Sequence, residues 1–321
     1  MRVTMREVAV RAGVSVKTVS RVVNEEPHIR PETRDQVRAA IAELGWTPNA
    51  SARTLRTGRT GVVGIAVAGL RRPLLAGLVE RLVMELDRQG LHAAVEPTHD
   101  DPARLAAALG LRGYTFDALL AVDAPELPAE AVAAEDGPVV RVDVTRRLPS
   151  PPAVDVVRAD LDQAVNTALR HLRVMGHHRP VLVGPGPLAE PGRELARVDP
   201  GPGEIGRAAG FRAAQRALTE HPGVDALICG TDEIALGALA GLHAAGVDVP
   251  GRVAVIGYGN LDDGRFSTPS LTTIDPDPIS LARNAIDLLI ARLAERGRAP
   301  ESVSVPVTLV QRESTSAAAA R

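Results

Sequence analysis

Apolar side chains recur every three or four positions along the first 45 residues, which is the spacing of one helical face. The spacing predicts a first short helix that begins after Thr4, where Glu7 completes a capping box, and that ends at Gly13. It predicts a second helix capped by Ser15 and a third from Pro31 to Leu44. Three short helices that each have one apolar face can close a small hydrophobic core.

The second predicted helix has two chemically different faces. Three valines point inward (Val19, Val22 and Val23), and the opposite side carries Val16, Lys17, Ser20 and Arg21. A tight glycine turn followed by a helix with such an outer face is typical of helix-turn-helix proteins, which place this helix in the major groove of DNA. A helical hairpin without a role in DNA binding is the alternative interpretation, because short amphipathic helices are common.

The segment after the third helix combines one large apolar residue with several arginines. Asn49 can cap a short helix from Ala50 to Leu55, which Arg53 and Arg56 accompany. A helix of this length is not stable alone. A segment that folds only on its partner suits a side chain that wedges into the minor groove of DNA. A solvated basic linker is the alternative.

Charge separates the two parts of the chain. Residues 1–60 carry 11 Lys or Arg and 6 Asp or Glu, a net charge of +5, whereas residues 61–321 carry 26 and 33, a net charge of -7. Attraction to DNA phosphates is therefore confined to the first 60 residues, and binding should weaken steeply with salt. Of the 37 basic residues, Lys17 is the only lysine. A flexible ammonium group reads base edges differently from a planar guanidinium.

From residue 61 onwards the hydrophobic pattern changes to alternating strands and helices. Apolar runs such as Val62 to Gly69 and Val253 to Tyr258 are separated by amphipathic patterns such as Leu74 to Gly90 and Leu161 to Met175. Strands that alternate with helices predict an α/β fold with parallel sheets. A body of this length is large enough for two small domains.

Several motifs, in this order along the chain, are similar to those of the LacI/GalR family of transcriptional regulators. They are VAVRAGVSVKTVSRVVN, RPETRDQVRAAIAELGWTPNASARTLRTGRTGVVGI, HLRVMGHHRPVLVGP, TDEIALGAL, VAVIGYGN, PSLTTID and VPVTLVQREST. The resemblance implies an N-terminal helix-turn-helix head and a hinge helix. These are joined to a core of two subdomains with parallel sheets, the periplasmic-binding-protein-like architecture of type I.

The resemblance also implies how the chain is divided. Residues 1–47 form the helix-turn-helix domain, and residues 48–60 form the hinge helix and linker. Residues 61–321 form a core for effector binding and dimerisation. Within this core, subdomain one is expected at about 61–156 and 277–300, and subdomain two at about 157–276 and 301–314.

The DNA-contacting residues follow from the match to the family's head. Val16, Lys17 and Arg21 fall where the family reads bases in the major groove, and Ala52 and Leu55 fall where its hinge helix enters the minor groove, with Leu55 as the wedge. The positions that match contacts to the DNA backbone are Thr18, Ser20, Asn24, His28 and Thr33. Arg30 departs from the pattern, because a Ser cap usually precedes that proline, so we expect a weaker helix start there.

In the family, the cleft between the subdomains binds a small molecule, and this chain departs from its relatives there. RRPLL, from Arg71 to Leu75, stands where many members have Asn-Pro-Phe-Phe, so a stacking ring is missing. GYGN, from Gly257 to Asn260, stands where many have Gly-Phe-Asp-Asp, so two acceptors for sugar hydroxyls are missing. Arg207 is the best match to the family's effector-clamping arginine, with Arg193 and Arg197 as rivals. The expected effector-binding residues are Leu74, Arg207, Asp232, Tyr258, Asn260 and Asp275.

Aromatic residues are scarce, with one Trp, two Tyr and three Phe in the chain. Trp46 is expected to pack in the core of the head. The candidates nearest the motif for stacking against a sugar ring are Tyr258 and Phe266, although core packing is the more ordinary role for a ring.

No pattern of residues predicts an enzyme, a metal site or a cofactor. The loop GPGPLAEPG resembles a phosphate-binding loop only in its glycines, because its prolines lack N–H groups. Cys229, the sole cysteine, follows an apolar run and is expected to be buried. No apolar run is long enough to span a membrane and no export signal is present, so we expect a cytoplasmic protein. The last residues lack leucine heptads, which favours a homodimer.

Two hypotheses about function remain. The first is a dimeric repressor that binds a palindromic operator in double-stranded DNA and is switched by a small-molecule effector, a sugar or related metabolite. The second is a DNA-binding regulator whose degenerate cleft senses no small molecule, and which is controlled by its abundance or by a protein partner. Asp232, Arg207 and Asp275 favour the first hypothesis. The second is favoured by Leu74, Leu75, Gly259 and the region from Pro187 to Gly206, which is shorter than is usual in the family.

Overall fold

The chain forms two compact units, Met1–Thr60 and Gly61–Arg321. The structure is a computed structural model that describes residues 3–23, 26–46, 58–132, 137–146, 154–184, 195–199 and 206–316. Each unit has its own hydrophobic core, and the two units are called the head and the body below.

The described residues of the head form three helices, α1 (Met5–Arg11), α2 (Val16–Val23) and α3 (Pro31–Leu44). The expected capping box is confirmed, because the Thr4 side chain accepts from the backbone N–H of Glu7 while the Glu7 carboxylate accepts from the backbone N–H of Thr4 at 2.7 Å. The buried residues of its core are Val8, Ala9, Val19, Val22, Val37, Ala40 and Trp46. Trp46 therefore packs in the head as expected, and Val23, Ile41 and Leu44 lie at the margin of the core.

Both ends of α3 follow from local chemistry. Arg30 occupies the N-cap position and makes no capping hydrogen bond, as its departure from a serine predicts. Gly45 ends the helix in the left-handed conformation, at φ 57°. The expected hinge helix, with Ala52 and Leu55, lies outside the described residues, as does Asn24.

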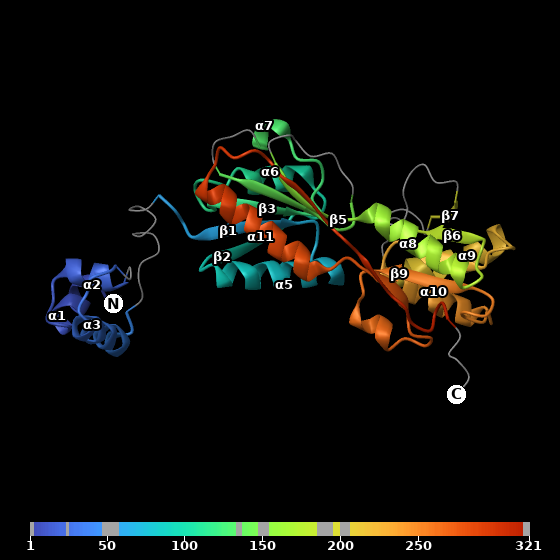
Figure 1. Ribbon diagram of the computed structural model, residues 1–321, viewed down its shortest axis with the longest axis horizontal. Helices are drawn as coiled ribbons and strands as arrows, with labels where there is room; N and C mark the ends of the chain where they lie inside the picture. Colours follow the sequence, from blue (N-terminus) through green and yellow to red (C-terminus); the bar gives the residue numbers. More distant parts are fainter. Residues whose placement is uncertain are drawn as a thin grey trace. The chain divides into compact units, whose positions relative to one another are not determined.

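The first sheet of the body contains six parallel strands in the order β11-β5-β4-β3-β1-β2. The strands are β1 (Val62–Val67), β2 (His92–Pro97), β3 (Ala118–Val122), β4 (Val139–Asp143), β5 (Asp155–Ala159) and β11 (Ser302–Val305). One face is covered by α5 (Pro73–Arg88) and α11 (Pro278–Ala294), and the other by α6 (Pro102–Leu109) and α7 (Ala129–Val132) (Figure 1). Buried side chains alternate between the two faces, as a sheet between two helical layers requires.

The second sheet has the order β12-β10-β9-β8-β6-β7. Its strands are β6 (Pro180–Val183), β7 (Ala196–Val198), β8 (Ala226–Cys229), β9 (Ala254–Tyr258), β10 (Thr272–Asp275) and β12 (Thr308–Val310). All pairings are parallel except that of β12 with β10, which is antiparallel. α8 (Leu161–Val174) covers one face, and α9 (Arg207–Glu220) and α10 (Asp232–Ala244) cover the other. The α/β fold with two mainly parallel sheets is thereby confirmed.

The chain passes between the two sheets three times, after β5, after β10 and after β11. Two boundaries differ from those that the resemblance implied. β5 belongs to the first sheet as far as Ala159, and β11 also pairs with β5 in the first sheet, although residues 301–314 were expected in subdomain two. Ser302 to Val305 pair in parallel with β5, so the backbone hydrogen bonds of this segment are made in the first sheet. The chain therefore returns to the second sheet only at β12.

In the part of the chain that the structure describes, no helix is both long and apolar enough to cross a lipid bilayer.

Candidate functional site

The outer face of α2 is the candidate DNA-reading surface. Val19 and Val22 are buried on its inner side, whereas Val16 is 43% exposed and Lys17 is exposed. The Ser15 hydroxyl accepts from the backbone N–H of Thr18 at 3.1 Å and lies 2.9 Å from its hydroxyl, so the first turn of α2 is fixed. The head thus presents Val16 and Lys17 on a rigid helix.

Arg21 is the one expected base-reading residue that already has a partner in the described head. Its Nε lies 3.0 Å from a carboxylate oxygen of Glu26, and both side chains are more than one-third exposed. An exposed pair of this kind is weak, so DNA can compete for the guanidinium. His28, which matched a backbone contact, is exposed in the left-handed conformation at φ 69°, and Ser20 and Thr33 are partly exposed.

In the body, backbone conformations that are unusual for residues other than glycine gather at the carboxyl ends of strands. Among the described residues of the body, the non-glycine residues with positive φ are His99 and Asp100 after β2, Asp123 after β3, Asn260 after β9 and Asp277 after β10. In parallel α/β sheets ligands bind outside the carboxyl ends of the strands. Strained backbone of this kind clusters at functional sites. Both observations favour this edge as the ligand site.

Asp232 is fully buried at the first position of α10. Its carboxylate accepts from the Thr273 hydroxyl at 2.6 Å and from the backbone N–H of Leu261 at 2.7 Å. Burial raises the pKa of Asp232 to about 6, and these two hydrogen bonds oppose the rise. The carboxylate therefore holds together two segments of the second subdomain.

Asn260 and Asp275 form a second part of the same network. The Asn260 amide donates to Asp275 at 2.8 Å, and its carbonyl oxygen accepts from Arg312 at 2.8 Å. Arg312 also donates to the backbone of Leu271 at 2.7 Å. The structure thus brings Asp232, Asn260 and Asp275 together and satisfies them from within the protein. Sequence reasoning missed Arg312, since its position in VPVTLVQREST gives no sign of a partner 52 residues away.

Tyr258 and Leu74 lie between the two subdomains and are buried, at 1% and 8% exposure. The Tyr258 hydroxyl donates to the carbonyl oxygen of Val144 at 2.7 Å, so the ring is not available as an open stacking surface. Gly259 follows with φ 131°, and a Cβ added there would lie 3.7 Å from Leu74 Cδ2. The first subdomain therefore packs directly on the GYGN segment.

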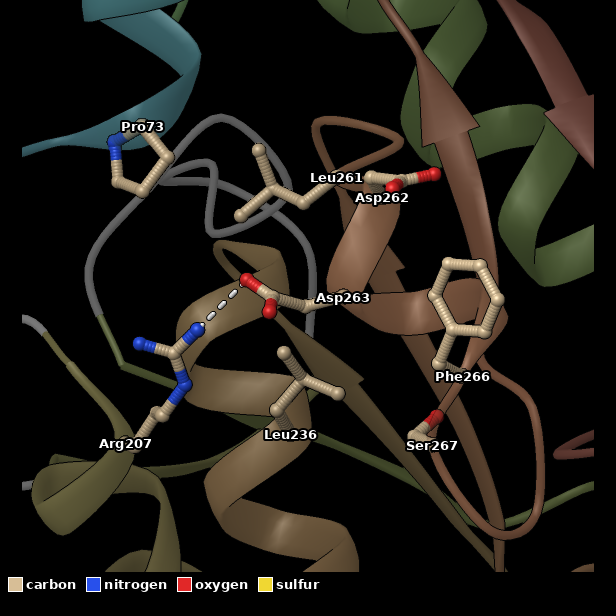
Figure 2. A pocket seen from close by; sticks show the side chains of 8 residues that line it. All are labelled: Pro73, Arg207, Leu236, Leu261, Asp262, Asp263, Phe266 and Ser267. Atoms are coloured by element: carbon tan, nitrogen blue, oxygen red, sulfur yellow. Dashed lines mark hydrogen bonds and ion pairs between the residues drawn. The ribbon is translucent and has the colours of Figure 1, made fainter.

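A pocket of about 540 Å³ opens beside this network (Figure 2). It is lined by Pro73, Arg207, Leu236, Leu261, Asp262, Asp263, Phe266 and Ser267. Arg207 is the only one of the six expected effector residues in this lining, and it forms a 2.7 Å ion pair with Asp263. Of its rivals, Arg197 is exposed on β7 and Arg193 lies outside the described residues. Phe266, which was a stacking candidate, lines the pocket with 79% of its surface exposed.

The other lining residues were not found from the sequence. Asp262 and Asp263 belong to the short 3-10 helix Asp262–Arg265, which follows the GYGN motif directly. Their proximity to that motif was the available signal. Pro73 comes from the first subdomain and the other seven residues come from the second, so the pocket lies where the two subdomains meet.

The described residues also show how the remaining reactive side chains are placed. In this part of the chain no three His, Cys, Asp or Glu side chains are arranged to hold a metal ion. Cys229 is fully buried, and burial raises the pKa of its thiol.

Two family models match the chain. Residues 4–49 match the bacterial regulatory proteins of the lacI family, and residues 191–315 match a periplasmic binding protein-like domain. A curated relative is the HTH-type transcriptional repressor PurR of Escherichia coli O1:K1 / APEC, which is 30% identical over 97% of this chain and 96% of its own. PurR of Erwinia tasmaniensis is 28% identical over the same shares.

Solved structures are similar over nearly the whole chain. The Lac repressor dimer bound to operator and the anti-inducer ONPF superposes with a TM-score of 0.82 at 25% identity, covering 98% of this chain and 99% of that one. The complex of the transcriptional regulator CelR with cellobiose has a TM-score of 0.68 at 25% identity, covering 98% and 100%. These relatives are regulators of transcription and not enzymes. The chain belongs to the LacI family of bacterial regulatory proteins and is a DNA-binding transcriptional repressor with a periplasmic-binding-protein-like core.

Proposed function

We propose that the protein is a homodimeric repressor that binds a palindromic operator. Val16, Lys17 and Arg21 read bases in the major groove, and Ala52 and Leu55 enter the minor groove. Thr18, Ser20, Asn24, His28 and Thr33 contact the DNA backbone. The observation that carries the proposal is the rigid α2 helix, which exposes Val16 and Lys17 opposite the buried Val19 and Val22. A repressor of this kind acts in the cytoplasm, where bacterial DNA lies.

Selection of bound fragments from a pool of random duplex DNA tests this assignment. The full chain should recover sites with two inverted half-sites, and sedimentation should give the mass of a dimer. Leu55→Gly should bind non-specific duplex nearly as well as the parent but should lose the bend in the recovered site, because the wedge is absent. A Leu55→Gly protein that bends this site as strongly as the parent contradicts the role of Leu55.

For the cleft, we propose a sugar or related metabolite as the effector. The pocket offers a guanidinium on Arg207, carboxylates on Asp262 and Asp263, and an exposed ring on Phe266. Carboxylates and guanidinium groups bind vicinal hydroxyls, and an aromatic ring packs against the apolar face of a sugar. The cellobiose complex of CelR is a related structure with a carbohydrate bound. Differential affinity of such a ligand for two subdomain arrangements is sufficient to change DNA binding.

A second candidate has support from a specific observation. The groups that would bind an effector deepest in the cleft, Asp232, Asn260 and Asp275, already satisfy one another through the protein. This arrangement favours a core that senses no small molecule and a repressor controlled by its abundance or by a protein partner.

Thermal unfolding of the full chain with a panel of sugars, glycosides, nucleosides and organic acids separates the two candidates. A ligand at about 100 times its dissociation constant stabilises the bound state by roughly 2.7 kcal/mol, which is a clear shift. Arg207→Gln should reduce the shift for a ligand bound in the pocket. No shift with any member of the panel, from a chain that still binds DNA, supports the second candidate.

A further inference from the structure

We infer that Tyr258 is a latch between the two subdomains, whose hydrogen bond to Val144 holds the cleft at one spacing. This assigns to Tyr258 a positioning role in place of the effector contact that the motif implied. The inference deepens the proposed function. It rests on that function in one respect, namely that the spacing of the two subdomains controls the cleft.

The bond joins two segments that belong to different sheets. Tyr258 is the last residue of β9 in the second sheet, and Val144 follows β4 in the first sheet. The phenol oxygen lies 2.7 Å from the carbonyl oxygen, and the two residues are 1% and 0% exposed. Water is therefore excluded from a hydrogen bond that exists only while the subdomains are in contact.

A buried carboxylate fixes the acceptor side of the bond. Asp123, which is fully buried with φ 46°, accepts from the backbone N–H of Val144 at 2.7 Å and from that of Thr145 at 3.0 Å. It also accepts from the Thr145 hydroxyl. Three donors on one carboxylate leave the turn little freedom, so the Val144 carbonyl is held in the direction of the second subdomain.

A second buried carboxylate fixes the donor side. Asp232 holds the backbone N–H of Leu261, three residues after Tyr258, and the hydroxyl of Thr273 on β10. The backbone N–H of Gly259 donates to Ile274 at 2.8 Å. Each half of the latch is thus anchored within its own subdomain, and the Tyr258 hydroxyl connects the two anchored segments.

The free energy of the Tyr258–Val144 hydrogen bond depends on how far apart the two subdomains lie. When the subdomains separate, water can replace both partners, so the parent protein loses little beyond the net value of one hydrogen bond. Tyr258→Phe leaves the Val144 carbonyl without a donor only in the closed arrangement, because the open arrangement lets water reach it. The substitution should therefore favour the open arrangement by roughly five- to tenfold.

The test measures the distance between the subdomains directly, in the full chain. Ala107→Cys on α6 and Gln215→Cys on α9 place exposed thiols on the first and second subdomains, and the native Cys229 is fully buried and does not compete for the label. A donor and an acceptor dye on these thiols, with labelled chains diluted in unlabelled chains, report the spacing by single-molecule energy transfer. The measurement requires neither DNA nor an effector, so it remains informative even if the proposed function is wrong.

Thr98→Val provides the matched control. Thr98 is 1% exposed and its hydroxyl donates to the Val67 carbonyl at 3.1 Å, entirely within the first subdomain. Both variants lose one buried hydroxyl donor and should unfold at lower temperature than the parent. Of these two variants, only Tyr258→Phe should shift the distance distribution towards longer spacings. Thr145→Val, which frees one of the bonds that hold the Val144 turn, should shift it in the same direction by a smaller amount.

The two outcomes are distinct. A shift in Tyr258→Phe and Thr145→Val, but not in Thr98→Val, supports the latch. A distance distribution in Tyr258→Phe equal to that of the parent, with a loss of stability like that of Thr98→Val, reduces this bond to an ordinary buried hydrogen bond and overturns the inference. A distance distribution in Thr145→Val equal to that of the parent likewise overturns the role of the turn at Val144 that Asp123 holds.

Discussion

Asp232 and Asp143 are buried carboxyl groups whose contribution to the free energy of unfolding depends on pH. Burial raises the pKa of each to about 6, and Arg141 opposes this rise at Asp143 through a 2.7 Å ion pair. In the unfolded chain the usual pKa of each group is 3.8. The folded protein therefore holds protons that the unfolded chain releases between about pH 4 and pH 6. Their contribution to stability is complete below this window and is lost as the pH rises through it.

We predict that the free energy of unfolding of the body decreases from pH 4 to pH 6, with each group contributing on the order of 3 kcal/mol. Asp232→Asn should remove its share, because the amide carries no charge at any pH. Denaturant titrations followed by circular dichroism at several pH values measure this slope. An equally steep slope in Asp232→Asn and the parent would assign the dependence to other groups.

In the proposed function, Lys17 is one of the residues that read bases in the major groove. It is exposed on α2, with no partner among the described residues of the head. Lys17→Ala should relax the preference at one position of each half-site and cost about 1–3 kcal/mol of specific binding. Lys17→Arg, which keeps the charge, should retain affinity for non-specific DNA while changing the preferred base. Competition binding against single-base variants of the selected site checks both, and an unchanged preference in Lys17→Ala excludes Lys17 from base reading.

Residues whose environment is set by near neighbours could be predicted from the sequence. The Thr4–Glu7 capping box and the left-handed Gly45 depend on residues within one helical turn. Tyr258 could not be assigned in this way, because its partner Val144 is 114 residues away and joins it only when both sheets are complete. Arg312 could not be assigned to the cleft for the same reason, because its partner Asn260 is 52 residues away in the sequence.

At the scale of elements, α9 and α10 approach so closely that glycines replace side chains between them. A Cβ added to Gly210 would lie 2.0 Å from the carbonyl oxygen of Ile234, and one added to Gly237 would lie 1.9 Å from that of Arg207. Since Arg207 lines the pocket, this contact positions the start of α9 and with it the guanidinium. A Cβ added to a third glycine, Gly241, would lie 2.5 Å from the carbonyl oxygen of Phe211.

The same substitution should therefore have opposite effects on two helices. Gly237→Ala forces α9 away from α10 and should destabilise the body by about 1–3 kcal/mol. Gly77→Ala on α5 meets nothing within 4 Å and should stabilise it by about 0.5–1 kcal/mol, because alanine restricts the unfolded chain. Urea unfolding of the two variants measures both signs. A stable Gly237→Ala protein would mean that the two helices can separate without cost.

The long periodic helices could be predicted from the sequence, whereas three of the shorter strands could not. The expected helix from Pro31 to Leu44 matches α3 at both ends. β5 and β7 were not recognised, and β11 was assigned to the wrong subdomain, because segments of three to five residues carry little periodicity. Their place in a sheet depends on which neighbouring strand has a free edge.

At the scale of the molecule, the head and the body are separate compact units, and each has its own hydrophobic core. Trp46, the only tryptophan, is 7% exposed in the core of the head, so its fluorescence reports the head alone. We predict that denaturant unfolding followed by Trp fluorescence and by circular dichroism gives different midpoints. Val37→Ala should lower the fluorescence midpoint, by about 2 kcal/mol of head stability, and leave the dichroism midpoint in place. Midpoints that move together in Val37→Ala would show a single cooperative unit.

The three passages of the chain between the sheets have a consequence for biosynthesis. The first sheet receives its edge strand β11 only when Ser302 to Val305 have left the ribosome, and the second receives β12 only three residues later. Neither sheet can therefore be completed before residues 302–310 have been made, although the head, which needs only the first 46 residues, can fold as soon as it emerges. A newly made chain thus completes its helix-turn-helix head long before it completes the pocket between its two subdomains.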